Sequence, residues 1–269
     1  MNDLLQISKK IRISVVESLT AAGSGHLGGS LGMADIFTIL YFNTLNHNPK
    51  NPDWSERDRL ILSIGHIAPV LYASLAHSGY FPVEDLVTLR KLGSKLQGHP
   101  CKDSELPGIE VSSGSLGQGL SISVGLALAA KMDKKDWKTY CILGDGELQE
   151  GSVWEAAMSA AHHKLNKLIA IVDRNNCQID GKTKDVMELE PLSEKWKAFG
   201  WNVIECDGNN LEQLLKVFNE LIPVNNKPSV LIAKTKMGKG IKSIEDDYHW
   251  HGKVPSKENM KEFILELNS

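Results

Sequence analysis

The stretch CILGDGELQEGSVW, residues 141–154, leads from an apolar run into a helical pattern through an aspartate held between two glycines. The apolar run, Tyr140–Leu143, has the character of a buried strand, and the segment from Ser152 to His163 has helical spacing. Ligands of open α/β sheets bind beyond the carboxyl ends of the strands, which is where this pattern places Asp145. The stretch therefore predicts a strand, a turn that carries a polar site, and a helix.

Strand-like and helix-like segments alternate along the whole chain. Several strands are apolar throughout, which is typical of a parallel sheet covered on both faces. We therefore predict a single α/β domain over residues 1–269, with a doubly wound, mostly parallel sheet and helices on both faces. The expected strands are 58–63, 140–143, 167–173, 201–207 and 228–236, and the expected helices are 4–22, 33–46, 67–77, 83–92, 120–131, 152–163, 192–199, 211–221 and 256–267.

Composition argues against several classes of function. The chain has 30 basic and 33 acidic residues, a net charge of −3, and no basic block, so we expect neither a nucleic-acid partner nor a membrane partner. No apolar run approaches the length of a membrane span. Four cysteines, at 101, 141, 177 and 206, lack metal-binding spacing. We interpret them as reduced thiols of a cytoplasmic protein.

A second polar segment, DRNNCQIDG, follows the next predicted strand. Asn175 lies thirty positions after Asp145, which is the length of one crossover unit, so neighbouring strands would bring the two side chains to one sheet edge. Carboxylate and carboxamide oxygens suit Mg²⁺ that also binds a diphosphate. Alternatively, Asp145 caps the following helix and the two asparagines form a tight turn. The combination at this spacing favours the metal site.

Four of the nine histidines lie beside glycine in loops: His26 in SGHLG, His66 in SIGH, His99 in QGHP and His251 in WHG. Glycine-bordered histidines in loops at the sheet edge suit a polar pocket, where imidazoles can relay protons near neutral pH. The other five have an ordinary structural interpretation, on the surface or satisfied in the core; these are His47, His77, His162, His163 and His249.

The segment 144–181 resembles the thiamine-diphosphate signature, a GDG followed about thirty residues later by an asparagine. Nearly the whole chain resembles the N-terminal third of transketolase. The further motifs are SGHLGGSLGMADI (24–36), NPDWSERDRLILSIGH (51–66), LGSKLQGHP (92–100), GSLGQG (114–119) and WHGK (250–253). The resemblance implies thiamine diphosphate and Mg²⁺, or Ca²⁺ or Mn²⁺ in its place. The metal ligands would be Asp145, Asn175 and the backbone carbonyl of Cys177.

The resemblance also implies roles for the loop residues in moving a two-carbon unit from a ketose to an aldose. His26 and His251 would stabilise an alkoxide and relay protons, His99 would contact sugar hydroxyls, and His66 would lie near the diphosphate. Arg90 would bind the substrate phosphate; alternatively it is a solvated charge on a helix. The expected cofactor contacts are His66, Gly114, Ser115, Leu116, Gly146, Glu150, Asn175 and His251, and the expected catalytic residues are His26, His66, His99 and His251.

One essential group has no counterpart in this chain. Family enzymes activate the cofactor with a glutamate from a second domain, and this sequence stops at Ser269 after a serine-capped closing helix, which resembles a natural terminus. The resemblance therefore implies a split transketolase whose C-terminal subunit supplies that glutamate. Glu150 and Glu155 match family positions at the dimer interface, so we also expect contact between two copies of this chain.

Three other interpretations stay open. The chain could belong to another split thiamine-diphosphate enzyme, of the 2-oxo acid dehydrogenase alpha type or a deoxyxylulose-phosphate synthase fragment, although WHGK and the SGHLG loop argue against these. It could be a transketolase for an unusual ketose phosphate, which nothing in the chain excludes. It could also be a non-catalytic binding subunit, although the retained Asp145, Asn175 and four loop histidines argue against that.

Overall fold

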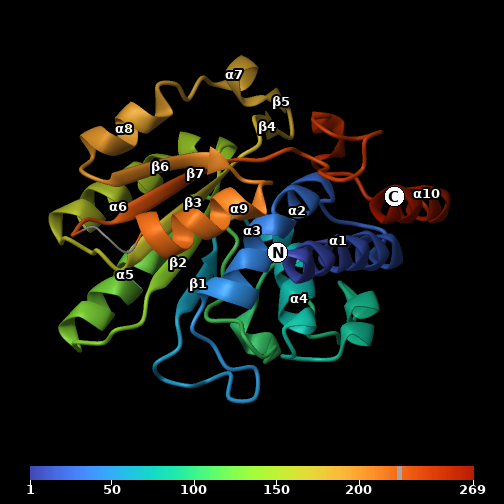
Figure 1. The fold of residues 1–269 in the computed structure, drawn as a ribbon, viewed down its shortest axis with the longest axis horizontal. Helices are drawn as coiled ribbons and strands as arrows, with labels where there is room; N and C mark the ends of the chain where they lie inside the picture. The colour runs from blue at the N-terminus through green and yellow to red at the C-terminus, as the bar shows by residue number, and fades with distance from the viewer. Residues whose placement is uncertain (223–225) are drawn as a thin grey trace.

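A five-stranded parallel sheet forms the centre of the molecule in the computed structural model, which describes residues 1–222 and 226–269 (Figure 1). The strand order is β1-β2-β3-β7-β6, and every neighbouring pair is parallel. Their bounds are β1 Arg59–Leu62, β2 Thr139–Gly144, β3 Leu168–Arg174, β6 Asn202–Asp207 and β7 Ser229–Lys234. A separate two-stranded hairpin consists of β4 Cys177–Gln178 and β5 Gly181–Lys182.

Successive residues of the central strands enter different hydrophobic clusters. Ile142 and Ile171 belong to one cluster, whereas Leu143 and Val172 belong to the other. Side chains of a strand alternate between the two faces of its sheet, so both faces of this sheet are buried. All seven residues of β3 are buried. This burial explains why the sequence of β3 is an almost unbroken apolar run, and it confirms the doubly wound α/β class.

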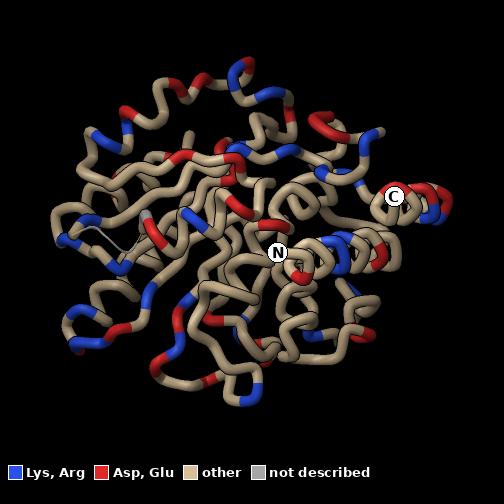
Figure 2. The backbone as a smooth tube through the Cα atoms, in the orientation of Figure 1, with Lys and Arg blue, Asp and Glu red and all other residues tan. Residues whose placement is uncertain are grey.

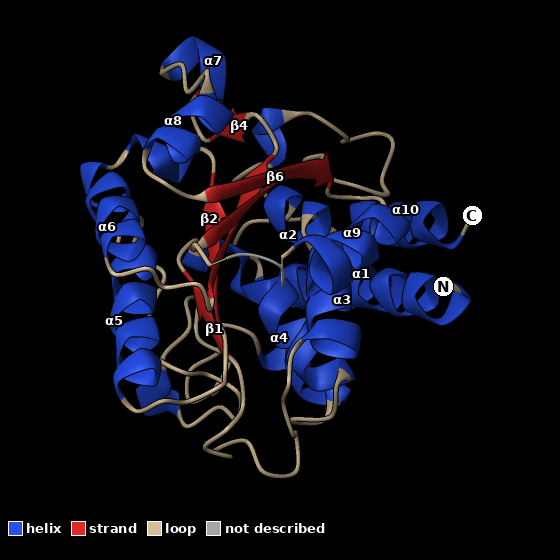
Figure 3. Ribbon diagram, turned by 60° about the vertical axis from the view of Figure 1, so that its left-hand side comes forward, coloured by secondary structure: helices blue, strands red, loops and turns tan. Residues whose placement is uncertain are grey.

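Helices cover both faces, as Figure 3 shows with the sheet seen nearly edge-on. Helices of one face contribute to the larger cluster; they are α1 Asn2–Ala22, α3 Ala34–Ile39, α4 Ala68–His77 and α9 Leu211–Lys216. Helices of the other face contribute to the second cluster; they are α5 Gly119–Met132, α6 Gly151–His162 and α8 Leu192–Ala198. The remaining helices are α2 Gly28–Gly32, α7 Thr183–Val186 and α10 Lys257–Asn268. Ser256 caps α10 in a capping box with Asn259.

The glycine-rich segment near residue 28 is helical, whereas we expected no helix between residues 22 and 33. Helix α2 begins at Gly28, and α3 continues as a wider turn through Leu40–Thr44. A Cβ on Gly28 would lie 2.2 Å from the Met237 sulfur, and one on Gly32 would lie 2.7 Å from the Lys236 carbonyl oxygen. These glycines therefore permit close packing of a buried helix rather than interrupting it.

The prediction of a helix over residues 83–92 is wrong. Only a 3-10 turn, Val83–Thr88, forms there. Its buried apolar side chains are Leu86 and, just after it, Leu89, three positions apart, while Val83 and Val87 are exposed. Side chains three apart eclipse in a 3-10 turn, and so small an apolar face does not support a longer α-helix.

Charges of both signs are interspersed along the backbone (Figure 2). Within the described ranges, no helix combines the length and the apolar character that crossing a membrane requires. All four cysteines are free thiols, as expected, and three of them are buried.

Candidate active site

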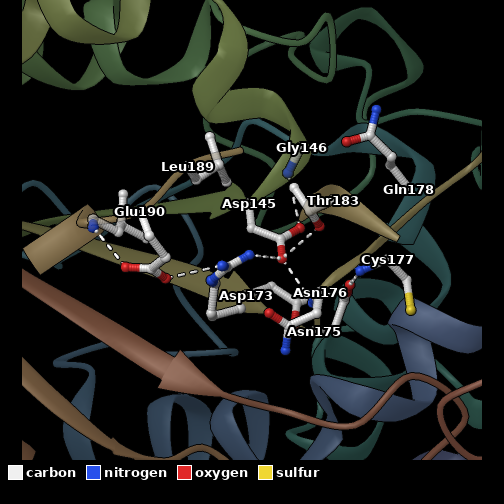
Figure 4. Close-up of polar contacts among 12 residues, drawn as sticks. Asp145, Gly146, Asp173, Asn175, Asn176, Cys177, Gln178, Thr183, Leu189 and Glu190 are labelled. Atoms are coloured by element: carbon white, nitrogen blue, oxygen red, sulfur yellow. Dashed lines mark hydrogen bonds and ion pairs between the residues drawn. The ribbon is translucent and has the colours of Figure 1, made fainter. Parts of the chain in front are cut away.

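Asp145 lies directly after β2, at the carboxyl edge of the sheet. Strands β2 and β3 are neighbours, with Gly144 paired to Asp173, so the segment that carries Asn175 leaves the sheet beside Asp145. This confirms the adjacency that the crossover spacing predicts. Asp145 is only 2 % exposed and Asn175 is 7 % exposed. Both side chains therefore belong to a buried polar cluster at this edge (Figure 4).

The Asp145 carboxylate is held by its neighbours on both sides. Its Oδ2 accepts hydrogen bonds from the Asn176 N–H at 2.7 Å, the Arg174 guanidinium at 3.0 Å and the Thr183 hydroxyl at 3.3 Å. Its Oδ1 accepts only the Gly146 N–H, at 2.8 Å, among the described residues. Burial nevertheless raises the pKa of Asp145 above its ordinary value, against the opposing effects of Arg174 and Asn176. Because a carboxylate oxygen has two lone pairs, Oδ1 retains one for a further partner.

Asn175 is oriented by Asp173, a fully buried residue of β3. The Asn175 amide donates from Nδ2 to the Asp173 carboxylate at 2.9 Å, and its Oδ1 accepts the Cys177 N–H at 2.9 Å. The Thr235 hydroxyl also donates to Asp173. Burial raises the pKa of Asp173 to about 7. The Cys177 thiol points away from Asp145, in agreement with a role for its backbone rather than its sulfur (Figure 4).

The donors at this edge fit a hard divalent cation. They comprise one carboxylate, one carboxamide and a backbone carbonyl, which are oxygen ligands of the kind that Mg²⁺ prefers when phosphates complete its shell. Over residues 1–222 and 226–269 no three or more His, Cys, Asp or Glu side chains are grouped to hold a metal by themselves. A cation at Asp145 would thus need ligands from a bound molecule. A cavity of about 480 Å³ lies beside Asn175 and Cys177, with Lys182 and Lys184 in its wall.

Three of the four predicted histidines gather at one point. The ring centroids of His26 and His66 are 5.0 Å apart, those of His66 and His251 are 5.0 Å apart, and those of His26 and His251 are 5.6 Å apart. The Nδ1 atoms of His26 and His251 are buried and have no hydrogen-bond partner among the described residues. Buried polar atoms are normally paired, so these two nitrogens indicate a place for a ligand.

Burial keeps these imidazoles neutral. It lowers the pKa of His26 to about 4 and that of His66 to about 3, and the neighbouring histidines add to the effect. The pKa of His251 is lowered by burial as well. Each ring therefore presents one donor and one acceptor nitrogen at neutral pH. Such a cluster can hydrogen-bond a substrate oxygen and pass a proton without carrying a fixed charge.

His99 lies at the rim of this cluster. Its side chain is exposed but packs on backbone: a Cβ on Gly65 would lie 2.2 Å from its Cδ2, and one on Gly114 would lie 2.7 Å from the same atom. The glycines thus allow the loop of His66 and the 114–119 loop to meet under one imidazole. Burial and then Arg90 lower the pKa of His99.

Arg90 is exposed and lies beside the loop of His26. Its backbone has a φ of 60°, and its guanidinium donates to the Ser24 hydroxyl at 3.4 Å. The alternative of a solvated charge on a helix is wrong in its geometry, because no helix forms at this residue. The guanidinium lies between the loops of His26 and His99: a Cβ on Gly98 would lie 3.2 Å from its Cζ, and one on Gly25 would lie 3.9 Å from its Nε.

Other predicted residues lie toward the surface. Gly114 is buried, but Ser115 and Leu116 are exposed just before the start of α5. Glu150 and Glu155 are exposed in and beside the first turns of α6. Their position suits an interface better than an enclosed pocket.

Several residues at this edge were not anticipated from the sequence. Asp173, Arg174 and Thr183 join the cluster around Asp145, and Glu147 is a buried carboxylate in the same turn. Burial raises the pKa of Glu147, against the hydrogen bonds that it accepts. An acidic residue in the first turn of a helix is ordinary in sequence, so no signal marked Glu147.

The doubly wound sheet and the polar groups at its carboxyl edge define a ligand-binding domain of the α/β class. The family described as "Transketolase, thiamine diphosphate binding domain" matches residues 5–266. The chain therefore belongs to the transketolase family, which confirms the relationship that the motifs indicated.

Relatives of the same length are known. The chain is 44 % identical to a protein of Phocaeicola vulgatus that is named as one subunit of apulose-4-phosphate transketolase, over 97 % of this chain and 92 % of that protein. It is 43 % identical to the 6-deoxy-6-sulfo-D-fructose transketolase subunit SqwG of Clostridium sp., over 98 % and 96 %. The crystal structure of transketolase from Campylobacter jejuni superposes with a TM-score of 0.93 at 36 % identity. The match covers 100 % of this chain and 43 % of that longer chain.

Proposed function

We propose that this chain is the diphosphate-binding subunit of a two-subunit transketolase, which transfers a two-carbon ketol unit from a ketose phosphate to an aldose phosphate. The observation that carries the proposal is a convergence at one sheet edge. Neighbouring strands place Asp145 beside the Asn175 segment, and His26, His66 and His251 gather at the same edge with two nitrogens unpaired among the described residues. Two of the same-length relatives are named as subunits of apulose-4-phosphate transketolase.

The chain's own residues would hold the cofactor at two places. Asp145, the Asn175 amide oxygen and the Cys177 carbonyl would bind Mg²⁺, or Ca²⁺ or Mn²⁺ in its place. Thiamine diphosphate, when bound, supplies the carbon nucleophile and the electron sink for cleavage beside a carbonyl. The residues alongside it would be His66, Gly114, Ser115, Leu116, Gly146, Glu150 and His251.

The histidines would handle the substrate. His26 and His251 are neutral, and their Nδ1 atoms would meet the substrate oxygen and move its proton. His66 would act from the same cluster. His99 and Arg90, both exposed at its rim, would contact sugar hydroxyls and the substrate phosphate.

The assembly and its setting complete the proposal. A C-terminal partner subunit would supply the cofactor-activating glutamate, and two copies of this chain would meet in a heterotetramer. The location would be cytoplasmic, which free thiols support. A place in the pentose phosphate pathway is the default, but the relatives named for apulose 4-phosphate and 6-deoxy-6-sulfo-D-fructose make unusual phosphorylated and sulfonated ketoses equally suitable test substrates.

The test is a two-carbon transfer assay with thiamine diphosphate and Mg²⁺. It is run on this chain alone and then with the protein that co-purifies with it. We expect activity only in the mixture. Asp145→Ala should lower kcat/KM at least about 100-fold, since a direct metal ligand is lost. The matched control is Asp133→Asn. Asp133 is exposed and follows the C-terminal end of α5, and its substitution should leave activity unchanged.

The outcomes separate the alternatives. Activity from the chain alone would contradict the need for a partner glutamate. No activity in the mixture on the phosphorylated and sulfonated ketoses would favour a non-catalytic binding subunit or another thiamine-diphosphate reaction.

A further inference from the structure

Glu147 is a buried carboxylate to which the proposed chemistry assigns no task. It lies two residues after Asp145, in the 3-10 turn Gly146–Gln149, and is 3 % exposed. Within the described part of the chain no Lys or Arg side chain forms an ion pair with it. A buried charge is costly unless hydrogen bonds compensate it, so the contacts of this side chain have to be substantial.

Its hydrogen bonds come from three separate segments. Oε1 accepts the Gly117 N–H at 2.7 Å and also the hydroxyl of Ser63, which follows β1. Oε2 accepts the Gly144 N–H, at the end of β2, at 3.1 Å. The Ser63 hydroxyl in turn accepts the Gly119 N–H at 3.0 Å. One side chain therefore ties the ends of two neighbouring strands to the 114–119 loop.

The 114–119 loop is held at several points, and the connection to Glu147 is one of them. Gly114, Gly117 and Gly119 are buried, whereas Ser115 and Leu116 between them are exposed. Beyond the bonds to Glu147 and Ser63, the Ser152 hydroxyl donates to the Gly117 carbonyl at 2.8 Å, and the Gly65 N–H donates to the Gly114 carbonyl at 3.4 Å. Ser115 and Leu116 thus lie between two anchored glycines, of which Gly117 is bound directly to Glu147.

The backbone conformation and the surroundings of Gly117 both exclude a side chain. Its φ is +81°, and a Cβ there would lie 2.8 Å from the Ser152 hydroxyl oxygen and 3.0 Å from the Glu150 Cβ. Glycine allows the backbone to come close enough for its N–H to reach the carboxylate.

We propose that Glu147 is a positioning residue for the cofactor. It fixes the position of the 114–119 loop relative to Asp145 and the 3-10 turn that follows it. The inference rests on the proposed function, in which Asp145 holds the metal and Gly114, Ser115 and Leu116 contact the same cofactor. Both oxygens of the carboxylate are needed, because Oε1 accepts the Gly117 N–H and Oε2 accepts the Gly144 N–H. A glutamine would turn an NH₂ group toward one of these N–H groups, which breaks one connection and keeps the volume.

The experiment compares wild type, Glu147→Gln and Glu84→Gln, an exposed control on the Val83–Thr88 turn. Hydrogen exchange is measured on the full chain. Thiamine diphosphate affinity with Mg²⁺ is measured by calorimetry on the chain with its co-purifying partner. In Glu147→Gln we expect faster exchange confined to residues 112–120 and to Gly144, and a Kd raised about 10- to 100-fold. The kcat at saturating cofactor should stay near wild type, because Glu147 touches no reacting atom. Glu84→Gln should match wild type throughout.

Each outcome decides something. If the wild type binds no thiamine diphosphate, the proposed function falls and the role of Glu147 falls with it. If the wild type binds and Glu147→Gln binds equally well, the role of Glu147 alone is wrong. If Glu147→Gln does not fold, Ser63→Ala removes one donor and keeps the carboxylate. It should then show the same local exchange and a smaller rise in Kd, and wild-type values for both would overturn the proposal.

Discussion

At the scale of single residues, the site contains groups whose pKa values burial has moved away from their ordinary values. Asp173 has its pKa raised to about 7, whereas His66 has its pKa lowered to about 3. Strongly perturbed groups cluster at functional sites, because the same burial that shifts a pKa also excludes water from the chemistry. The two kinds of group make opposite contributions to stability as pH changes.

The histidine contribution predicts acid sensitivity. The folded pKa of His66 lies below its unfolded value of 6.5, so between these values the unfolded chain binds a proton that the folded chain does not. Stability from this group is complete above pH 6.5 and is lost as pH falls. From pH 6.5 to about 5.5 we expect wild type to lose roughly 1 kcal/mol more than His66→Gln, measured by urea unfolding.

The comparison with His66→Gln also cancels the contribution of Asp173, which has the opposite dependence on pH. Asp173 binds its proton more tightly when folded, so its contribution rises as pH falls through the interval from about 7 to 3.8, but it does so in both variants. His162→Gln, an exposed position at the end of α6, should follow the wild-type curve. Parallel curves for wild type and His66→Gln would contradict the buried, neutral state of His66.

At the scale of elements, glycines decide how closely helices approach the sheet edge. Helix α5 contains two glycines in different surroundings. A Cβ on Gly119 would lie 2.4 Å from the Ser63 Cβ and 2.7 Å from the Ser63 Cα, whereas a Cβ on Gly125 would meet nothing within 4 Å. The first glycine sets the contact between α5 and the end of β1, and the second has no packing reason to be glycine.

The two positions therefore predict opposite effects of one substitution. Gly119→Ala should destabilise the chain by about 1–3 kcal/mol, because the helix start must move away from Ser63. Gly125→Ala should stabilise it by about 0.5–1 kcal/mol, because alanine loses less entropy in a helix. Both are measured as free energies of unfolding in urea. Equal effects at both positions would mean that α5 does not pack against Ser63 as described.

At the scale of the whole molecule, the chain spans 43 % of a complete transketolase chain and carries one face of the proposed active site. Helices α5 and α6 lie on one side of the sheet. Leu116, just before α5, is 44 % exposed, and Met158 on α6 is 59 % exposed. Glu150 and Glu155, at the start of α6, are exposed as well. Apolar side chains so placed suit contact with a second copy of this chain. Helix α10 lies on the opposite side (Figure 3).

This arrangement predicts a dimer of the isolated chain. Light scattering after size exclusion should give twice the 29.6 kDa of the chain, and a larger complex once the partner is added. Met158→Asp on α6 should shift the chain toward monomer, whereas Leu265→Asp, 71 % exposed on α10, should not. A clean monomer for the wild type, with and without partner, would contradict the heterotetramer.

The sequence alone determined what depends on local pattern. Apolar runs, crossover lengths and ordered motifs were enough for the doubly wound fold, for the adjacency of Asp145 to the Asn175 segment, and for the transketolase relationship. The fold and the adjacency follow from side-chain periodicity and from the short reach of one crossover, whereas the relationship rests on the resemblance of the motifs to the family.

Only the tertiary structure decided the rest. The helix at Gly28 and the 3-10 turn before Arg90 depend on what packs against them, which propensity does not record. The meeting of His26, His66 and His251, and the three segments joined by Glu147, link residues far apart in the chain. Their pKa shifts arise because folding removes these side chains from water, and the sequence does not state which side chains become buried.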